Sequence, residues 1–426
     1  MRSRFLISVA MSDLIALALA MMAASYLVFD TLLPWEATTP GADPRMLAFL
    51  VVSMVVLSFV TNQMSGPGVP RPTYGRMVAI LLGTLLLTAS LLLVTRSNYS
   101  LSFMPLTAAF WLIPATAHRI VRRQRPWTEK FGVITLEKQL ADDLHAADHA
   151  DVLWVLEPDR ESPGELPARE VTLAVDLRAV LSESMAQYLS SADVAGYTIR
   201  PFSSIYEEHT GRVPLVHLSE GWEISAPLLE VAQWLPGKRI FDTLATLLTA
   251  PLWIPLGVLV SAYVKISDPG FSIFKQERVG LGGRVFTMYK FRTMHLDSES
   301  NGAQFATRRD PRLIRGGAFL RRARLDEIPQ LWNVLKGDMS LVGPRAEQVP
   351  FVSEFRQQIP FYDHRHMVRP GITGWAQVNY GYADDEAETI EKLTYDLYYI
   401  KHMSPVMDLR IFWKSIWTVL TGAGAR

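Results

Sequence analysis

The chain of 426 residues contains no cysteine, and only 20% of its residues are charged. The absence of cysteine excludes disulfide scaffolds, thiol catalysis, and zinc or iron–sulfur sites with cysteine ligands. The 42 Lys and Arg equal the 42 Asp and Glu in number, so no excess of basic charge points to a nucleic acid as partner. We therefore expect no nucleic-acid binding.

The balanced total hides three regions of different charge. Residues 1–130 contain 11 Lys and Arg against 5 Asp and Glu, whereas residues 131–235 contain 6 against 18. Residues 236–426 contain 25 against 19. Charge of alternating sign favours separate modules over one continuous core, and the length suits two to four domains of about 100–200 residues each.

Long apolar runs fill the first region. A bilayer core needs about 20 apolar residues in a helix, and four stretches come close to that length: residues 6–29, 46–64, 77–95 and 101–118. The sequence therefore predicts a four-helix transmembrane bundle over residues 1–125. Asp13 lies inside the first run, where an ionisable group is either functional or packed against neighbouring helices.

The flanking charges predict the orientation of this bundle. Acidic residues dominate the first outer loop, which carries Asp30, Glu36 and Asp43. Arginines occupy the opposite ends of the runs: Arg2, Arg4, Arg71, Arg76, Arg119, Arg122, Arg123 and Arg125. Because basic residues are retained on the cytoplasmic side, both ends of the bundle are expected there, and so is the rest of the chain.

The acidic middle region alternates short β-rich runs with helical ones. Runs typical of strands occur at residues 131–136, 151–156, 171–177 and 197–202, which predicts a small parallel, Rossmann-like α/β module over residues 131–235. Dinucleotide binding would need a Gly-rich turn after the first strand, but residues 135–138 read TLEK. We therefore expect a regulatory or oligomerising module.

A fifth apolar run spans residues 240–264. Pro251 and Pro255 lie in its middle, where each removes a helical hydrogen bond. Basic residues flank both of its ends, which favours keeping both ends on the cytoplasmic side. We interpret the run as a re-entrant membrane helix that enters, breaks at Pro251 and returns; a proline-kinked transmembrane helix is the alternative.

The C-terminal region combines a hairpin with charged motifs. Residues 271–279 and 284–294 alternate as two strands, with Lys290 and Arg292 on one face. Asp326 and Glu327 immediately precede a short helix predicted at residues 329–336, and clustered arginines lie just upstream. Carboxylates beside arginines suit metal-assisted or nucleophilic phosphate chemistry. A helix cap and ordinary surface ion pairs are the alternatives.

Two glycine- and proline-rich segments follow. Arg345 projects from a Gly-Pro turn, and residues 368–379 form a tight loop of the kind that often lines sites. Five segments together resemble the bacterial sugar transferase family, the monotopic phosphoglycosyl transferases: KRIFD (238–242), FKQERVG (274–280), KFRTM (290–294), LDEIPQLWNVLKGDMSLVGPR (325–345) and RPGITGWAQVN (369–379).

The resemblance is strongest to the long branch of this family, the polyprenyl-phosphate sugar phosphotransferases of exopolysaccharide assembly. It implies transfer of a sugar-1-phosphate from a UDP-sugar to undecaprenyl phosphate, with release of UMP and a covalent aspartyl intermediate. The catalytic module would span residues 238–426 with an α+β fold. The partners implied are the nucleotide sugar, the polyprenyl phosphate and membrane lipids, and we expect a homodimer in the bacterial inner membrane.

The resemblance also assigns roles. Asp326 and Glu327 form the catalytic pair, Mg²⁺ binds to Asp326, and Arg345 binds phosphate. We add Arg324, Lys290 and Arg292 as phosphate-binding candidates, and assign nucleotide or lipid-headgroup contact to Arg369, Gly371 and Trp375. A membrane scaffold that has lost its chemistry is the alternative, and the presence of Asp326, Glu327 and Arg345 together argues against it.

Overall fold

The computed structural model describes residues 2–36, 44–63, 74–95, 100, 102–124, 128–162, 164–218, 234–296, 311–380 and 386–421. Its internal contacts divide the chain into two compact units, Met1–Thr210 and Gly211–Arg426. The orientation prediction depends largely on charged side chains that the structure does not describe, namely those of Asp43, Arg2, Arg4, Arg71, Arg76, Arg122, Arg123 and Arg125.

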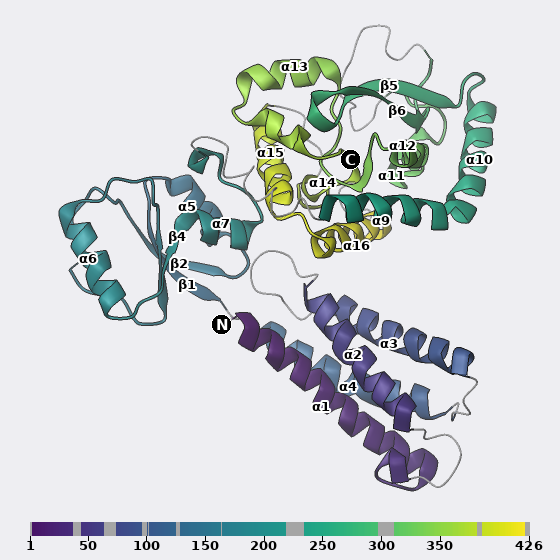
Figure 1. Ribbon diagram of the computed structural model, residues 1–426, viewed down its shortest axis with the longest axis horizontal. Helices are drawn as coiled ribbons and strands as arrows, with labels where there is room; N and C mark the ends of the chain where they lie inside the picture. Colours follow the sequence, from purple (N-terminus) through teal and green to yellow (C-terminus); the bar gives the residue numbers. More distant parts are fainter. Residues whose placement is uncertain are drawn as a thin grey trace. The chain divides into compact units, whose positions relative to one another are not determined.

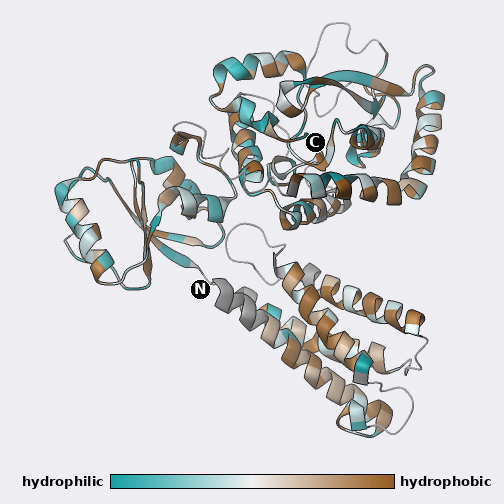
Figure 2. Ribbon diagram, in the orientation of Figure 1, coloured by the Kyte–Doolittle hydropathy of each residue, from teal (hydrophilic) through white to brown (hydrophobic). Residues whose placement is uncertain are grey.

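Four helices open the first unit: α1 (Arg2–Phe29), α2 (Pro44–Gln63), α3 (Tyr74–Thr95) and α4 (Phe103–Gln124). Their buried side chains share one hydrophobic core, to which Leu17, Leu50, Ile80 and Trp111 contribute one from each helix. Within the described residues, Ala10–Glu36 and Met77–Thr95 are long and apolar enough to cross a membrane, and Leu47–Thr61 is apolar but shorter. Figure 2 shows how hydrophobic residues dominate α2 and α3.

Asp13 in α1 is paired with Arg119 in α4. The guanidinium donates hydrogen bonds of 2.7 and 2.8 Å to the two carboxylate oxygens, and both side chains are 2% exposed. Asp13 therefore serves packing, because pairing offsets the cost of burying each charge. Helix α4 continues past its predicted end at residue 118, so Arg119 belongs to the helix rather than to a cytoplasmic loop.

The α/β part of the first unit is built on a parallel sheet with strand order β2-β1-β3-β4. The strands are β1 (Glu129–Ile134), β2 (Ala150–Leu156), β3 (Val171–Val175) and β4 (Ile199–Pro201). Helices α5 (Lys138–His145) and α7 (Phe202–Thr210) cover one face, and α6 (Glu183–Val194) covers the other (Figure 1). The predicted parallel α/β module is confirmed.

The second unit contains an antiparallel hairpin and a small parallel pair of strands. The hairpin consists of β5 (Ile273–Val279) and β6 (Val285–Phe291), and the parallel pair of β7 (Ser340–Val342) and β8 (Gly371–Thr373). The helices are α9 (Trp234–Leu248), α10 (Ala250–Ser267), α11 (Gly317–Arg322), α12 (Gln330–Lys336), α13 (Val349–Gln358), α14 (Trp375–Asn379), α15 (Glu386–Lys401) and α16 (Pro405–Thr421).

The fifth apolar run is broken into α9 and α10 at Thr249, two residues before Pro251. The two helices diverge from this break (Figure 1). The Thr249 hydroxyl donates to the carbonyl of Ala245 at 2.7 Å, and the Trp253 indole donates to the carbonyl of Thr246 at 2.9 Å. These side chains satisfy carbonyl groups near the end of α9, as a break inside an apolar helix requires. Helix α10 is itself long and apolar enough to cross a membrane.

The second unit begins at Gly211, ahead of the predicted start of the catalytic module at residue 238. Val213 and Leu218 are buried in the same core as the helices α15 and α16. The Trp375 indole donates to the carbonyl of Gly211 at 2.9 Å, and the amide of Val213 donates to the carbonyl of Thr394 at 3.1 Å. Residues 211–218 therefore complete the core of the C-terminal unit.

We expect a chain of residues 211–426 to be more stable in detergent than a chain of residues 237–426. Removing the buried Val213 and Leu218 side chains should cost roughly 3 to 6 kcal/mol, measured by denaturant unfolding. In the full chain, Val213→Ala should lower the unfolding midpoint, whereas Val216→Ala should not, because Val213 is 1% and Val216 47% exposed. Equal midpoints for the two shortened chains would contradict this role.

Candidate active site

The segment that carries the two acidic residues is anchored by its apolar neighbours. Asp326 and Glu327 lie in the single 3₁₀ turn Leu325–Glu327, between α11 and α12. On either side of the pair, Leu325 and Ile328 pack against a core that includes Val260 and Val264 of α10. The carboxylate pair is thereby attached to the apolar helix α10. The predicted helix after the pair is present as α12.

Glu327 is a buried carboxylate held by two arginines. Its side chain is 8% exposed and accepts hydrogen bonds from Nη1 of Arg345 at 3.1 Å and from Nη1 of Arg324 at 3.2 Å. Burial opposes its ionisation, but the charges and hydrogen bonds of Arg345 and Arg324 outweigh burial and hold the pKa of Glu327 below its usual value. Arg324 has a left-handed backbone, with φ of 55°.

Asp326 differs from Glu327 in its burial, its hydrogen bonds and the direction of its pKa shift. It is partly buried, and no group among the described residues hydrogen-bonds to its carboxylate. Burial and the adjacent charge of Glu327 raise the pKa of Asp326 to about 6, against the lowering effect of Lys290, Arg321 and Arg345. An accessible carboxylate that is ionised near neutral pH can act as a nucleophile or bind a metal ion.

Lys290 comes to this site from β6. Its ammonium lies 4.9 Å from the centre of the Phe274 ring, on the paired strand β5. Burial lowers the pKa of Lys290 to about 8, and the nearby charges of Arg278 and Arg321 add to this effect while Asp326 opposes it. Asp326 and Lys290 therefore influence each other electrostatically, and the phosphate-binding role of Lys290 stays a prediction.

Arg345 is placed by a close crossing of two glycine-containing segments. The amide of Gly343 donates to the carbonyl of Thr373, and the amide of Gly371 donates to the carbonyl of Pro344, each at 2.9 Å. A Cβ added to Gly371 would lie 2.1 Å from the nitrogen of Gly343, so no larger residue fits. Arg345 directly follows this crossing and extends to Glu327.

Three predicted site residues have structural partners instead. Arg292 is paired with Asp268 and donates to the carbonyl of Phe271 at 2.8 Å. Arg369 donates to the carbonyl of Gly337 at 3.0 Å, at the end of α12. Trp375 is 1% exposed and belongs to the hydrophobic core. The structure does not bring these three side chains to the carboxylate pair.

Two arginines that the sequence analysis did not select act on the site. The charge of Arg321 lowers the pKa of both Asp326 and Lys290, and the charge of Arg278 lowers the pKa of Lys290. Arg321 is oriented by its hydrogen bond to the hydroxyl of Thr293 at 2.8 Å, and Arg278 by its bond to the carbonyl of Ala346 at 2.9 Å. Arg278 lies in the segment FKQERVG, and Arg321 is one of the arginines just upstream of the carboxylate pair; these positions were the available signal.

The donor set suits a metal ion that is completed by a substrate. Within the described part of the chain, no three His, Asp or Glu side chains gather as a metal site. Mg²⁺, however, commonly binds through one or two carboxylates together with substrate phosphates and water. The carboxylate of Asp326, free of hydrogen bonds from the described residues, fits such a site, whereas Glu327 is already occupied by two guanidinium groups.

Comparison with known proteins covers both units. The family model for bacterial sugar transferases matches residues 233–422. A UDP-N-acetylgalactosamine-undecaprenyl-phosphate N-acetylgalactosaminephosphotransferase of Aeromonas hydrophila is 37% identical over 385 residues, which cover 89% of this chain and 86% of that protein. A UDP-glucose:undecaprenyl-phosphate glucose-1-phosphate transferase of Xanthomonas campestris pv. campestris is 43% identical over 208 residues, 48% of this chain and 42% of that protein.

A further UDP-glucose:undecaprenyl-phosphate glucose-1-phosphate transferase, from Escherichia coli K12, is 38% identical over 240 residues, or 55% of this chain and 49% of that protein. The first relative extends the similarity into the N-terminal unit, and the family model covers the part that contains the carboxylate pair and Arg345. This protein belongs to the bacterial sugar transferase family and is a phosphoglycosyl transferase enzyme.

Proposed function

We propose that the protein transfers a sugar-1-phosphate from a UDP-sugar to undecaprenyl phosphate, in the initiating step of a surface polysaccharide. The observation that carries this proposal is the contrast between the two neighbouring carboxylates. Glu327 is fixed in its ionised form by Arg345 and Arg324, whereas Asp326 has a pKa near 6 and is free of hydrogen bonds from described residues. The names of the relatives supply the two substrates.

In the first half-reaction, a carboxylate oxygen of Asp326 attacks the phosphorus that bears the sugar. The bond from that phosphorus to the bridging diphosphate oxygen breaks, and UMP leaves with the electron pair. In the second, an oxygen of undecaprenyl phosphate attacks the same phosphorus and displaces Asp326. The products are undecaprenyl-diphosphate-sugar and the regenerated carboxylate.

Positive side chains make this attack feasible by lowering the negative charge around the reacting phosphorus. Lys290, Arg321 and Arg345 supply charges that act on Asp326, and a guanidinium is suited to binding phosphate oxygens in pairs. When bound, Mg²⁺ held by Asp326 and the substrate phosphates would contribute further charge screening.

The membrane arrangement is part of the proposal. We infer that α1 to α4 form a transmembrane bundle and that α9 and α10 together form a segment that re-enters the cytoplasmic leaflet of the inner membrane. The α/β part of the first unit and the soluble part of the second unit would then face the cytoplasm. Support comes from large apolar side chains that remain exposed on α9, α10 and α16, such as Ile240, Leu244, Leu252, Leu259, Ile266, Phe412 and Ile416. The expected homodimer stays a prediction.

Replacing the nucleophile tests the mechanism. The wild-type enzyme should release about one UMP per site from its UDP-sugar without a lipid acceptor, because the aspartyl intermediate accumulates. Asp326→Asn should lower this release by roughly 10³-fold or more. Asp363→Asn is the matched control, since this carboxylate is 52% exposed and paired with Arg356 on the surface. Near-normal release by Asp326→Asn would show that another group is the nucleophile.

The shifted pKa values predict a bell-shaped dependence of kcat/KM on pH. Activity should fall as pH drops through about 6, because protonated Asp326 does not attack, and should fall as pH rises through about 8, because Lys290 loses its charge. Lys290→Arg keeps a cation at all relevant pH values and should remove the alkaline limb while leaving the acid limb. Lys275→Arg, at an exposed position of β5, should change neither. An unchanged alkaline limb in Lys290→Arg would exclude the lysine as its source.

Single cysteines test the membrane arrangement without background, because the chain has none of its own. In intact cells, a membrane-impermeant thiol reagent should label Glu36→Cys, between α1 and α2, but not Asp193→Cys or Ser267→Cys. The latter two should react once the inner face is opened. Labelling of Ser267→Cys from outside would mean that α10 crosses the membrane and would rule out re-entry.

A further inference from the structure

A second buried arginine lies behind Arg345. Arg365 belongs to the 3₁₀ helix Tyr362–Met367, and its side chain is 7% exposed. Its guanidinium makes three hydrogen bonds, to the hydroxyl of Tyr362 at 2.7 Å, to the carboxylate of Asp396 at 2.8 Å and to the backbone carbonyl of Arg345 at 3.0 Å. Arg365 thus links α15 to Arg345, the residue that contacts Glu327.

The bond to the carbonyl of Arg345 complements the glycine crossing. Strand β8 holds the preceding residue, through the amide of Gly371 and the carbonyl of Pro344. Arg365 holds the carbonyl of Arg345 itself. The backbone on which the Arg345 side chain is mounted is therefore fixed by two independent contacts, while its guanidinium extends 3.1 Å to Glu327.

Asp396 makes this placement of Arg365 possible. A buried guanidinium without a partner is strongly destabilising, and Asp396 supplies the opposite charge from α15 with only 2% exposure. Burial raises the pKa of Asp396 to about 6, against the lowering effect of Arg365 and Lys392. The Tyr362 hydroxyl and the charges of Glu347 and Lys392 complete the surroundings of this pair.

We propose that Arg365, held by Asp396, is a positioning residue that sets Arg345 for its contact with Glu327. The inference rests on the proposed function, since Arg345 and the carboxylate pair are the catalytic groups there. A displaced Arg345 would lose its 3.1 Å hydrogen bond to Glu327 and its place beside the carboxylate pair.

Arg365→Met should reduce kcat/KM by roughly 10- to 100-fold, the effect of misplacing a catalytic group by about 1 Å. Arg365→Lys, which keeps a cation beside Asp396, should recover part of this loss. Arg356→Met is the matched control: this arginine also pairs with a carboxylate, Asp363 at 2.8 Å, but on the exposed surface. It should leave kcat/KM unchanged.

A second comparison separates positioning from a general effect on folding. In an Arg345→Met background, measured as single-turnover UMP release with enzyme in excess, Arg365→Met should add little further loss, because coupled residues are not additive. Equal losses in both backgrounds would overturn the inference.

Two further variants guard against loss of the fold. Arg365→Met combined with Asp396→Leu removes both members of the buried pair and should lose kcat/KM as Arg365→Met does. Tyr362→Phe removes one acceptor but keeps the contacts to Asp396 and Arg345, so its kcat/KM should stay close to that of the wild type. The proposed function fails separately, if Asp326→Asn stays active; the inference alone fails if Asp326→Asn is inactive and the double variant has the wild-type kcat/KM.

Discussion

The burial of one ionised carboxylate organises the catalytic unit. Glu327 could not remain charged at 8% exposure without Arg345 and Arg324, which both donate hydrogen bonds to it. Once ionised, Glu327 raises the pKa of Asp326 next to it. The negative charge that the arginines stabilise therefore also makes the neighbouring carboxyl group harder to ionise. Two chemically similar residues adjacent in sequence thereby acquire different properties from their surroundings.

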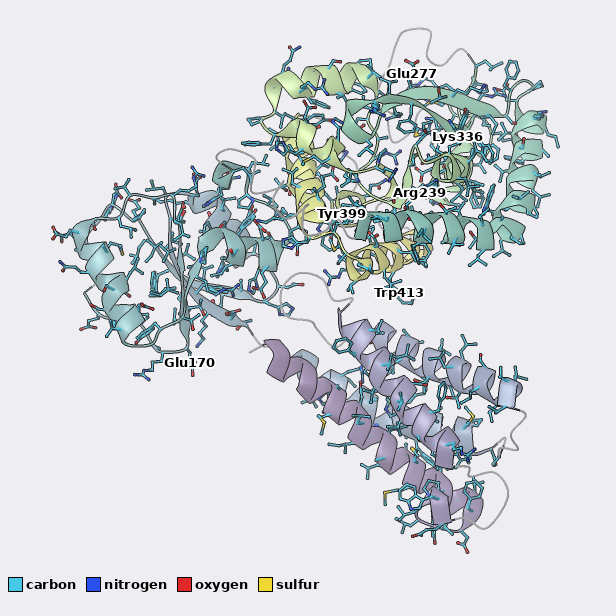
Figure 3. All side chains as sticks on the ribbon, viewed as in Figure 1. Glu170, Arg239, Glu277, Lys336, Tyr399 and Trp413 are labelled. Carbon is cyan, nitrogen blue, oxygen red and sulfur yellow. The ribbon has the colours of Figure 1, made fainter. Side chains whose placement is uncertain are left out.

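That cluster depends on backbone placed by contacts far along the chain. The glycine crossing between Gly343 and Gly371 fixes where Arg345 emerges. Helix α12, which follows the carboxylate pair, is held at its C-terminal end by Arg239 from α9, whose guanidinium donates to the carbonyl of Leu335 at 2.8 Å (Figure 3). A cation at the end of a helix also interacts favourably with its dipole. The apolar helices and the site are thus connected through hydrogen bonds as well as through packing.

Local sequence patterns predicted much of this arrangement. The parallel α/β sheet, the β5–β6 hairpin and the helix after the carboxylate pair follow from periodicity and turn residues. The grouping of Asp326, Glu327 and Arg345 was expected only from the resemblance to a known family, and Arg345 does contact Glu327. What periodicity could not give was the partner of each arginine. Arg292 pairs with Asp268 rather than with a site residue, and Arg119 pairs with Asp13 across 106 residues.

The same limit explains why Trp375 and Arg365 were misjudged or missed. A tryptophan in a Gly-rich loop suggests a binding surface, but its indole lies in the core because the carbonyl of Gly211 accepts its hydrogen bond there. Arg365 carries no distinguishing local pattern; its importance comes from the carbonyl of Arg345 and from Asp396, 31 residues away. Tertiary partners, rather than residue type, decide which charged groups serve the site.

The location of the carboxylate pair also suits two substrates of opposite solubility. Ile328, next to the pair, packs with the core that includes Val260 and Val264 of α10. The proposed reaction would present the same phosphorus in turn to a soluble leaving group and to a lipid acceptor. Its nucleophile would therefore need to be open to water and to lie beside a membrane surface. Attachment of the carboxylate segment to an apolar helix, with Lys290 of β6 and Arg345 supplying positive charge, is compatible with both requirements in a single site.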